Sequence, residues 1–345
     1  MATTILRLPF EQPICELEGR IERLEQVPTK SPETQEEVRR LRREWTELTK
    51  RIYSQLEPWQ TVQVARHPDR PMTSDYLEMV FDEFVELHGD KFFGDDCAVR
   101  TGFGKIGQYN VLVVGHEKGR TPKERHACNS GCAQPEGYRK AMAKMRLAAK
   151  FNRPVICLID TPGAHPGIGA EERGQAQVIA ESMLQMSRLA VPIICVVIGE
   201  GGSGGALGLG LGDRVAILQH AYYSVISPEG CAGILWKSNA YAEQAAKALK
   251  ITAPDLLAMG VVDDLVEEPI GGAHRDHHQM AARLKIYLTK ALRELVDQPP
   301  DERLAWRYEK FRRMGQFLEG GLLRGGPGAG DQLGLGLAST PPVAT

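Results

Sequence analysis

The first sixty residues carry two stripes of apolar side chains with the spacing of amphipathic helices. Apolar residues recur at intervals of three and four positions in each stripe. The stripes are Ile14, Leu17, Ile21 and Leu24, and then Val38, Leu41, Trp45, Leu48 and Ile52. Between them, Ser31-Pro32 is a typical helix start, because serine can cap the first amides and proline suits the first helical position. The sequence therefore predicts a charged helical hairpin over residues 1–60, which either docks on a partner or another subunit or is a solvated coiled segment.

Beyond His67-Pro68 the pattern changes to short β-rich runs that alternate with helical stretches. This alternation favours an α/β fold over a helical bundle. Strands are predicted at residues 98–106, 109–115, 154–160, 191–198, 214–218 and 222–226. Helices are predicted at residues 74–88, 136–150, 171–189, 203–210, 239–249 and 274–296. We therefore expect one α/β domain over residues 61–300, followed by a helical end at residues 301–319.

The last 26 residues, from Gly320, hold eight glycines and no periodic apolar face. Such a segment buries too little apolar surface to offset the entropy lost on ordering. We expect residues 320–345 to form a disordered, glycine-rich tail.

Composition and charge narrow the classes of function. The 345 residues are 42% hydrophobic and carry a formal net charge of −2, so no global field attracts nucleic acid or an anionic membrane. Pro9, Glu11 and Pro13 interrupt the apolar run that a signal peptide needs, and the sequence has no apolar stretch of the roughly 18 residues in a membrane helix. Seven scattered cysteines indicate a reducing compartment, and Cys128 and Cys132 lack the second ligand pair of a structural zinc site. We expect a cytoplasmic protein without a metal of its own.

The strongest chemical signal is the segment from Gly199 to Ala206, which has five glycines in its first seven positions. It follows the predicted strand at residues 191–198 and precedes a helix of small residues. A ligand can approach the main chain where no Cβ is present, and the first amides of a helix point their N–H groups outward. Such a corner is suited to stabilising an oxyanion.

Three kinds of chemistry can use this corner. Read as Gly-x-Gly-x-x-Gly from Gly199, it matches a dinucleotide fingerprint, but the next strand ends in Gln219 where an acidic residue is required. Read as Gly-x-Ser-x-Gly around Ser203, it matches the nucleophile elbow of a serine hydrolase, which needs a histidine and an acid; the candidate histidines are His165, His220 and His274. The third possibility is an oxyanion hole for an enolate, which needs no nucleophilic side chain.

Two further segments repeat the plan of strand, Pro/Gly turn and small-residue helix. They are residues 159–174, which include Gly163 and Ala164, and residues 223–232, which include Ser227, Pro228, Glu229 and Gly230. Each is either the wall of a site or an ordinary structural turn. Lys118 and Arg120, after the strand at residues 109–115, are candidates for binding an anionic group, although charged residues are also common on solvated turns.

Five runs, in this order, resemble the carboxyltransferase α subunits of bacterial acetyl-CoA carboxylases. They are Gly137-Tyr138-Arg139-Lys140-Ala141, Asp160-Thr161-Pro162-Gly163-Ala164, Gly169-Ala170-Glu171-Glu172-Arg173-Gly174-Gln175, Gly199 to Ala206, and Ser227-Pro228-Glu229-Gly230-Cys231. With the helical opening and Arg66-His67-Pro68, the resemblance covers roughly residues 8–318. It implies an α/β, crotonase-like (ClpP/crotonase) ββα spiral core over residues 61–300. One stretch departs from the family, because Asn129-Ser130-Gly131-Cys132 stands where an Asn-Phe-Gly-Met-like run is usual.

The resemblance also implies a reaction. In this family, carboxybiotin on a carrier protein gives up CO2, a proton leaves the methyl group of acetyl-CoA, and malonyl-CoA forms in the first committed step of fatty acid synthesis. The biotin left after loss of CO2 and the deprotonated acetyl-CoA are both enolates. Each carries an oxyanion, which main-chain N–H donors stabilise. The resemblance places the oxyanion hole for biotin at Gly204 and Gly205, with Gly201 and Gly202 beside them. It places substrate contacts at Lys118, Arg120, Gly163, Ala164, Ser227, Pro228, Glu229 and Gly230.

The implied partners are a carboxyltransferase β subunit in an α2β2 assembly, the biotin carboxyl carrier protein and biotin carboxylase. Zinc is expected only in the β subunit, because this chain lacks the Cys-x-x-Cys pairs of a zinc ribbon. It also lacks a biotin-acceptor segment and a Walker loop, so we expect no covalently bound cofactor. Two rival functions remain at this point: a noncatalytic scaffold whose glycines only allow close packing, and a crotonase-like serine hydrolase that uses Ser203.

Overall fold

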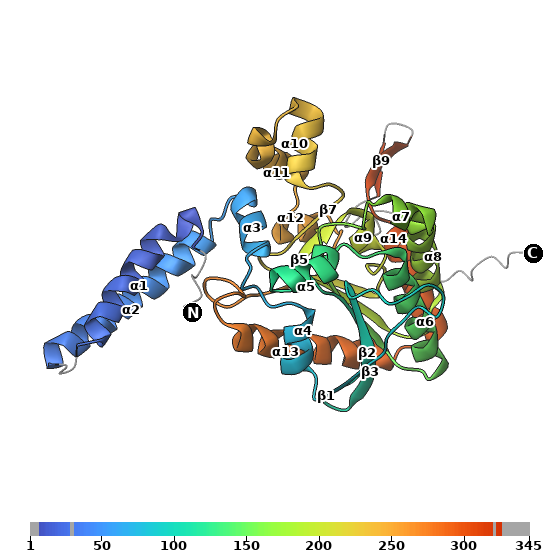
Figure 1. The fold of residues 1–345 in the computed structure, drawn as a ribbon, viewed down its shortest axis with the longest axis horizontal. Coiled ribbons are helices and arrows are strands. Elements are labelled where there is room, and N and C mark those ends of the chain that lie inside the picture. The colour runs from blue at the N-terminus through green and yellow to red at the C-terminus, as the bar shows by residue number, and fades with distance from the viewer. Residues whose placement is uncertain (1–6, 28–30, 320–321, 326–345) are drawn as a thin grey trace, which may run out of the picture.

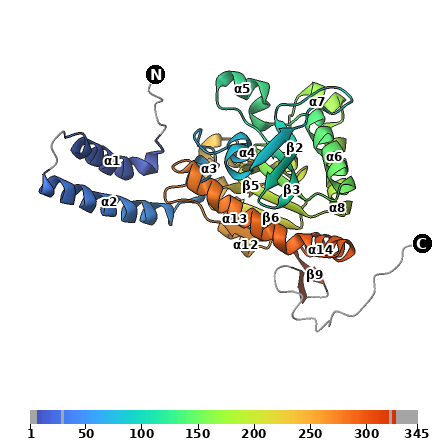
Figure 2. The same ribbon diagram turned by 90° about the horizontal axis from the view of Figure 1, so that it is seen from below.

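The computed structural model describes residues 7–27, 31–319 and 322–325, and shows an α/β body from which a helical hairpin projects (Figure 1). After the short helix η1 (Pro9–Glu11), helices α1 (Gln12–Glu25) and α2 (Pro32–Tyr53) pack against each other. Figure 2 shows both extending away from the body. Ser31 caps α2, since its Oγ accepts a hydrogen bond from the Thr34 amide at 3.2 Å. The two predicted N-terminal helices and the cap are confirmed.

Eight strands of the described chain form one mixed sheet. The order along its main path is β1 (Glu83–Glu86), β2 (Val99–Ile106), β3 (Tyr109–His116), β4 (Val155–Thr161), β5 (Ile193–Gly202), β6 (Arg214–Leu218) and β8 (Asp264–Val266), while β7 (Tyr222–Ser224) pairs with β5. The first three strands are antiparallel and the others run parallel. Strands β4 and β5 are buried along their whole length, which explains their unbroken apolar sequence. Cys157 of β4 and Cys195 of β5 are register partners in these strands, and both are free, buried cysteines.

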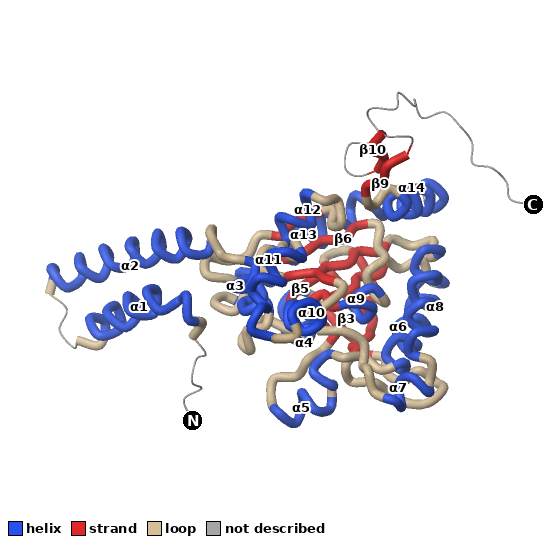
Figure 3. Tube along the Cα trace, turned by 90° about the horizontal axis from the view of Figure 1, so that it is seen from above, coloured by secondary structure: helices blue, strands red, loops and turns tan. Residues whose placement is uncertain are grey.

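Helices cover both sides of this sheet (Figure 3). Helix α6 (Pro135–Lys150) packs on β2, β3 and α8 (Gln175–Arg188), whereas α13 (His277–Val296) packs on β5, β8 and α4 (Thr73–Val80). Helix α9 (Ser203–Leu207) lies between β4, β5 and α8. The other helices are α3 (Pro58–Ala65), α5 (Pro122–Ala127), η2 (Asn129–Gly131), α7 (Ile168–Glu172), α10 (Pro228–Trp236), η3 (Asn239–Tyr241), α11 (Ala242–Leu249), α12 (Ala253–Ala258) and α14 (Pro300–Arg312). Within the described ranges, no helix is long and apolar enough to cross a membrane.

The predicted helix at residues 74–88 is wrong in its second half. Helix α4 ends at Val80, and residues 83–86 form strand β1, which pairs antiparallel with residues 102–105 of β2. Phe84 lies over Gly102, where an added Cβ would come within 2.5 Å of the Phe84 ring. Strand pairing and this ring contact therefore outweigh the local helical preference of a glutamate-rich segment.

The C-terminal end also differs from the prediction. Helix α14 ends at Arg312, and strand β9 (Gln316–Glu319) pairs antiparallel with β10 (Leu322–Gly325). The helical end expected over residues 301–319 is thus part helix and part strand, and residues 322–325 of the expected disordered tail are paired. Each of these strands is four residues long, and such short strands depend on their partner more than on a local sequence pattern. The rest of the predicted tail, residues 320–321 and 326–345, lies outside the described residues.

Candidate functional site

The glycine-rich segment forms the carboxyl end of β5 and the first turn of α9. Strand β5 continues to Gly202, four residues beyond its predicted end, and α9 starts at Ser203, whose φ of 50° marks the abrupt change of direction. The first amides of a helix have no carbonyl partner within that helix, and Gly202 at the N-cap has no side chain to cap them. Gly204 is half-buried and Gly205 is buried. The N–H groups of this turn are therefore available to an acceptor outside the helix.

The corner packs directly on the second predicted segment, at the end of β4. An added Cβ at Gly202 would lie 2.1 Å from the Pro162 carbonyl oxygen, and one at Gly205 would lie 2.5 Å from the Gly163 carbonyl carbon. At Gly204 the nearest atom would be in Ile179, at 3.8 Å, which is an ordinary contact. Close packing alone therefore accounts for Gly202 and Gly205, as in the scaffold hypothesis, but it does not require glycine at position 204.

Side chains of two neighbouring helices, α6 and α8, donate hydrogen bonds to main-chain carbonyls of α9 and its C-cap residue. The Tyr138 hydroxyl of α6 donates to the Gly205 carbonyl at 3.1 Å, and the Ser182 hydroxyl of α8 donates to the Gly208 carbonyl at 2.6 Å. Both donors are buried. These contacts hold α9 and its C-cap residue Gly208 against α6 and α8.

An apolar cavity of about 470 Å³ opens beside this corner. Ser203 and Leu207 form one wall, Tyr223 lies next to them, and Leu256 and Phe311 contribute from α12 and α14. The glycine corner is therefore not sealed inside the protein, and the space next to it suits a largely hydrocarbon group.

A buried carboxylate, Glu200, lies within the glycine segment at the centre of an ionic network. Its carboxylate accepts hydrogen bonds from Lys118 Nζ, Arg66 Nε and the Tyr222 hydroxyl, each at 2.6 Å. Lys118 Nζ also lies 2.6 Å from Asp160 Oδ1. These charged groups border a second cavity, of about 210 Å³, at the carboxyl ends of β4 and β5.

The electrostatics of this network keep Glu200 and Lys118 ionised. Burial alone would raise the pKa of Glu200, but Lys118 and Arg66 lower it to about 2. Burial likewise opposes the charge on Lys118, yet Asp160 and Glu200 more than offset it, so the pKa of Lys118 lies above its ordinary value. Lys118 is thus a cation already paired with two carboxylates.

The other predicted contact residues are distributed unevenly. Ser227 caps α10, because its Oγ accepts from the Gly230 amide at 3.1 Å, and Glu229 in the same turn accepts from Arg66 Nη1 at 2.5 Å. The turn at residues 227–230 thereby joins the Glu200 network through Arg66. Arg120 is paired with Asp75 of α4 and lies outside that network. The structure thus brings together the predicted segments at residues 118, 163–164, 201–205 and 227–230, and it places Arg120 apart.

Sequence reasoning assigned no site role to four members of the network: Glu200 and Asp160, which lie inside predicted segments, and Arg66 and Tyr222, which do not. Arg66 lies 134 residues from Glu200 along the chain, and Tyr222 lies 22 residues from it. No local motif marks either residue as a partner of a strand-end carboxylate. Only the structure shows that Tyr222 lies on the buried side of β7, since its sequence, Tyr-Tyr-Ser, does not distinguish the two tyrosines.

The arrangement does not support a serine hydrolase. Among the described residues, the Ser203 hydroxyl makes no hydrogen bond to a histidine. His165 Nδ1 accepts from the Gly167 amide, His220 lies in the buried surroundings of Glu268, and His274 stacks on His67. No group of three or more His, Cys, Asp or Glu side chains in these ranges is placed to hold a metal ion.

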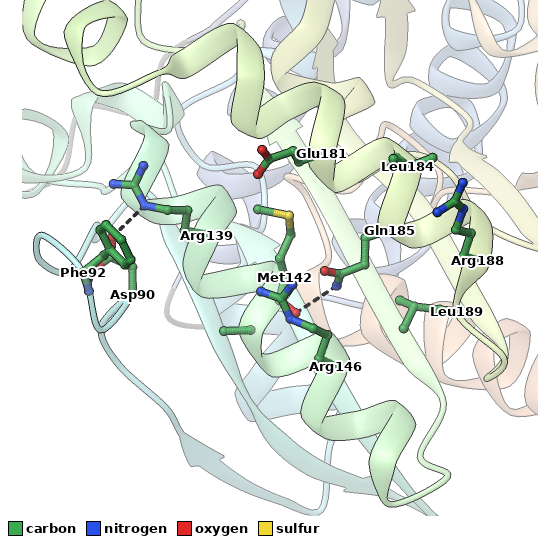
Figure 4. A pocket seen from close by; sticks show the side chains of 11 residues that line it. Asp90, Phe92, Arg139, Met142, Arg146, Glu181, Leu184, Gln185, Arg188 and Leu189 are labelled. Atoms are coloured by element: carbon green, nitrogen blue, oxygen red, sulfur yellow. Dashed lines mark hydrogen bonds and ion pairs between the residues drawn. The ribbon is translucent and has the colours of Figure 1, made fainter.

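A larger cavity, of about 580 Å³, lies elsewhere, between α6 and α8 (Figure 4). Figure 4 shows Arg139 bound to Asp90 at one end, and Gln185 of α8 bridging to the Met142 carbonyl of α6. None of the glycine-corner residues lines it. Cavity size therefore does not select the site, whereas the convergence of strand ends, main-chain amides and buried charge does.

The chain is similar to known proteins over most of its length. A protein-family model described as acetyl co-enzyme A carboxylase carboxyltransferase-like matches residues 7–315. The chain is 65% identical over 312 residues to the acetyl-coenzyme A carboxylase carboxyl transferase subunit alpha of Rhodopirellula baltica, with 90% of this chain and 98% of that protein covered. It is 51% identical over 313 residues to the subunit of the same name from Methylococcus capsulatus, with 90% and 98% covered.

Two solved structures share the fold at low sequence identity. A transcarboxylase 12S structure with methylmalonyl-coenzyme A and methylmalonic acid bound has a TM-score of 0.51 and 23% identity, covering 64% of this chain and 42% of that one. A Pseudomonas malonate decarboxylase hetero-tetramer in complex with coenzyme A has a TM-score of 0.52 and 18% identity, covering 62% and 86%. These likenesses establish the predicted α/β, crotonase-like fold of the core.

Proposed function

Because the chain belongs to the family of acetyl-CoA carboxylase carboxyltransferase α subunits, we propose that its glycine corner is the half-site that binds the ureido oxygen of carboxybiotin. The observation that carries this proposal is the first turn of α9. Its amides have no partner within the helix, and packing does not require glycine at position 204. The turn also borders an apolar cavity, through Ser203.

The chemistry needed from this chain is electrostatic. Carboxybiotin, when bound, supplies the CO2 that is transferred to acetyl-CoA to give malonyl-CoA for fatty acid synthesis. The N–H groups of Gly204 and Gly205 would donate to the ureido oxygen as negative charge develops there, and each preorganised donor is worth about 3 kcal/mol in such sites. Gly163 and Ala164 support Gly205 from below. The apolar cavity beside Ser203 would take the hydrocarbon part of the cofactor and exclude water.

The remaining half of the reaction belongs to partners. A carboxyltransferase β subunit, in an α2β2 assembly, would bind the thioester oxygen of acetyl-CoA and carry the zinc. The biotin carboxyl carrier protein would deliver the cofactor after biotin carboxylase has loaded it, in the cytoplasm. Arg120, Ser227 and Pro228 remain candidates for substrate contact in this scheme, with Glu229 and Gly230. Lys118 fits a supporting role better, because its charge is already paired.

The test uses the chain purified as a complex with its β subunit and follows malonyl-CoA-dependent carboxylation of free biotin. We expect Gly204→Val to lower kcat about 100-fold, because the added side chain shields the amides of the first turn. The complex should still assemble, since the new Cβ has an ordinary contact distance to Ile179. Assembly is checked by native mass spectrometry.

Ser203→Ala is the matched control at the neighbouring position. Its kcat should stay within about threefold of the unsubstituted complex, because the proposal gives the hydroxyl no role. If Gly204→Val kept its kcat within the same limit, the scaffold hypothesis would replace the proposal. Loss of activity in Ser203→Ala, with labelling of Ser203 by a fluorophosphonate, would support the hydrolase instead.

A further inference from the structure

The glycine corner is attached to its neighbours by charge as well as by packing. The main-chain N–H of Glu200 donates to Asp160 Oδ1 at 2.8 Å, across the gap between β5 and β4. The missing Cβ of Gly199 leaves room for that carboxylate, because a Cβ there would lie 2.5 Å from the same oxygen. The β4–β5 register shifts between Ile159 and Thr161, so Asp160 lies at an irregularity that turns its side chain toward β5.

The Glu200 side chain extends this attachment to three more segments. Lys118 follows β3, Arg66 follows α3, and Tyr222 is the register partner of Glu200 in β7. Arg66 continues to Glu229 in the first turn of α10. One carboxylate, 6% exposed, therefore connects the strand ends beneath the predicted oxyanion site to the turn at residues 227–230.

Such a network suits the placement of main-chain donors. Each donor of an oxyanion hole must be held within a fraction of an ångström, and buried charge-assisted hydrogen bonds resist displacement more than apolar contacts do. Glu200 lies four residues before Gly204 in the same continuous segment. A shift of its peptide is therefore transmitted directly to the first turn of α9.

We infer that Glu200 is a positioning residue for carboxyl transfer, which holds the amides of Gly204 and Gly205 in place through Lys118, Arg66 and Asp160. This inference rests on the proposed function. It reassigns Lys118 from a substrate-binding cation to a member of the support, because both of its carboxylate partners are already within 2.6 Å.

The test compares two substitutions at opposite ends of strand β5. Glu200→Gln keeps the shape and removes the charge at the carboxyl end. Asp213→Asn does the same near the start, where Asp213 Oδ2 accepts from the Ile193 amide at 2.7 Å and pairs with buried Arg307 at 2.7 Å. Both are assayed in the complex with the β subunit, by malonyl-CoA-dependent carboxylation of free biotin.

We expect Glu200→Gln to lower kcat about tenfold while the KM for malonyl-CoA stays within about twofold, because the thioester is held by the β subunit. Asp213→Asn should keep kcat within about twofold, even if it lowers the melting temperature as much as Glu200→Gln does. A second expected signature is a loss of kcat at alkaline pH in Glu200→Gln that the unsubstituted complex lacks, because Lys118 stays buried but keeps only one of the two carboxylates that hold its pKa up.

Three outcomes would overturn the inference: an unchanged kcat and pH profile in Glu200→Gln, a raised KM without a change in kcat, or an equal loss of kcat in Asp213→Asn. If Glu200→Gln does not fold, Glu229→Gln decides, since Glu229 is only partly buried. It should lower kcat about threefold, and an unchanged kcat would reject the network. An inactive unsubstituted complex would count against the proposed function itself, so the two failures can be told apart.

Discussion

Two buried glutamates in this chain, Glu11 and Glu200, have the same kinds of partners but lie in different places: one at the base of the projecting hairpin, the other at strand ends beside a cavity. Glu11 lies at the base of the helical hairpin, where it accepts hydrogen bonds from the Tyr53 hydroxyl at 2.8 Å and Arg275 at 2.7 Å. Arg275 is 264 residues away, in the loop before α13. These contacts, the hinge cluster, fasten the hairpin to the body.

Glu200 also accepts from one tyrosine and one arginine, but Lys118 is added and the group borders a cavity. It fixes the ends of several strands beneath an open corner, whereas Glu11 fixes one projecting element. The same chemistry therefore serves attachment in one place and alignment in the other, and the difference lies in what each carboxylate is connected to. The predictions below separate these two uses.

The largest effect on stability is expected at the hinge cluster. Glu11→Ala removes the shared acceptor of Tyr53 and Arg275, which leaves a buried hydroxyl and a partly buried cation without it. Arg275 keeps its ion pair with Glu18 at 2.6 Å, so we expect the lower end of the range for broken buried pairs, about 3 kcal/mol in the free energy of unfolding, as measured by denaturant titration. Glu47→Ala, on the exposed face of α2, is the control and should change stability by less than about 0.5 kcal/mol. Equal losses of the free energy of unfolding in the two variants would show that Glu11 does not stabilise the attachment of the hairpin to the body.

The next effect separates two adjacent glycines of the corner. Gly205→Ala should lower the free energy of unfolding by about 2 to 3 kcal/mol, because its Cβ would overlap the backbone of Gly163. Gly204→Ala should be neutral or slightly stabilising, since alanine favours the helix and only Ile179 is near. Thermal melts of both variants check this. A comparable loss at Gly204 would mean that packing, and not ligand access, explains glycine there.

A further effect is a dependence of stability on pH near the Glu200 network. His116 is fully buried at the end of β3, and burial lowers its pKa to about 3. The folded state therefore holds His116 neutral. The contribution of this residue to the free energy of unfolding is fully present above about pH 6.5, and it is lost progressively as the pH falls toward 3. From pH 7 to 5 the loss is about 2 kcal/mol from this residue.

His116→Leu should remove that part of the pH dependence, as measured by denaturant titrations at several pH values. His278→Gln, on the exposed start of α13, is the matched surface control. The prediction fails if the stability of His116→Leu falls between pH 7 and 5 as steeply as that of the unsubstituted chain.

The smallest expected effect is at Arg120, which lies outside both networks. Its partner is Asp75 and the side chain is partly exposed, so Arg120→Gln should cost about 0.5 kcal/mol of stability. If Arg120 binds an anionic group of the substrate, the KM for malonyl-CoA should rise about threefold with kcat unchanged. Steady-state kinetics of the complex decide the point, and an unchanged KM would leave Arg120 as a surface residue.

The sequence predicted elements whose cause is local. The stripes of the hairpin, the cap at Ser31 and the apolar runs of β4 and β5 all depend on neighbours a few residues away. It failed at residues 83–86, 316–319 and 322–325, where the partner strand decides between helix, coil and strand. The glycine corner was recognisable because its five glycines lie within seven consecutive positions.

By itself, then, the sequence determined the α/β class, the hairpin helices and the family to which the chain belongs, because each is written in contiguous motifs and local periodicity. Only the tertiary structure decided which charges meet. Lys118 turned out to be paired with Asp160 and Glu200, and Arg66 proved to be the link to Glu229. Ion pairs between residues far apart in the chain leave no local pattern, since their geometry is set by where the strands end in space.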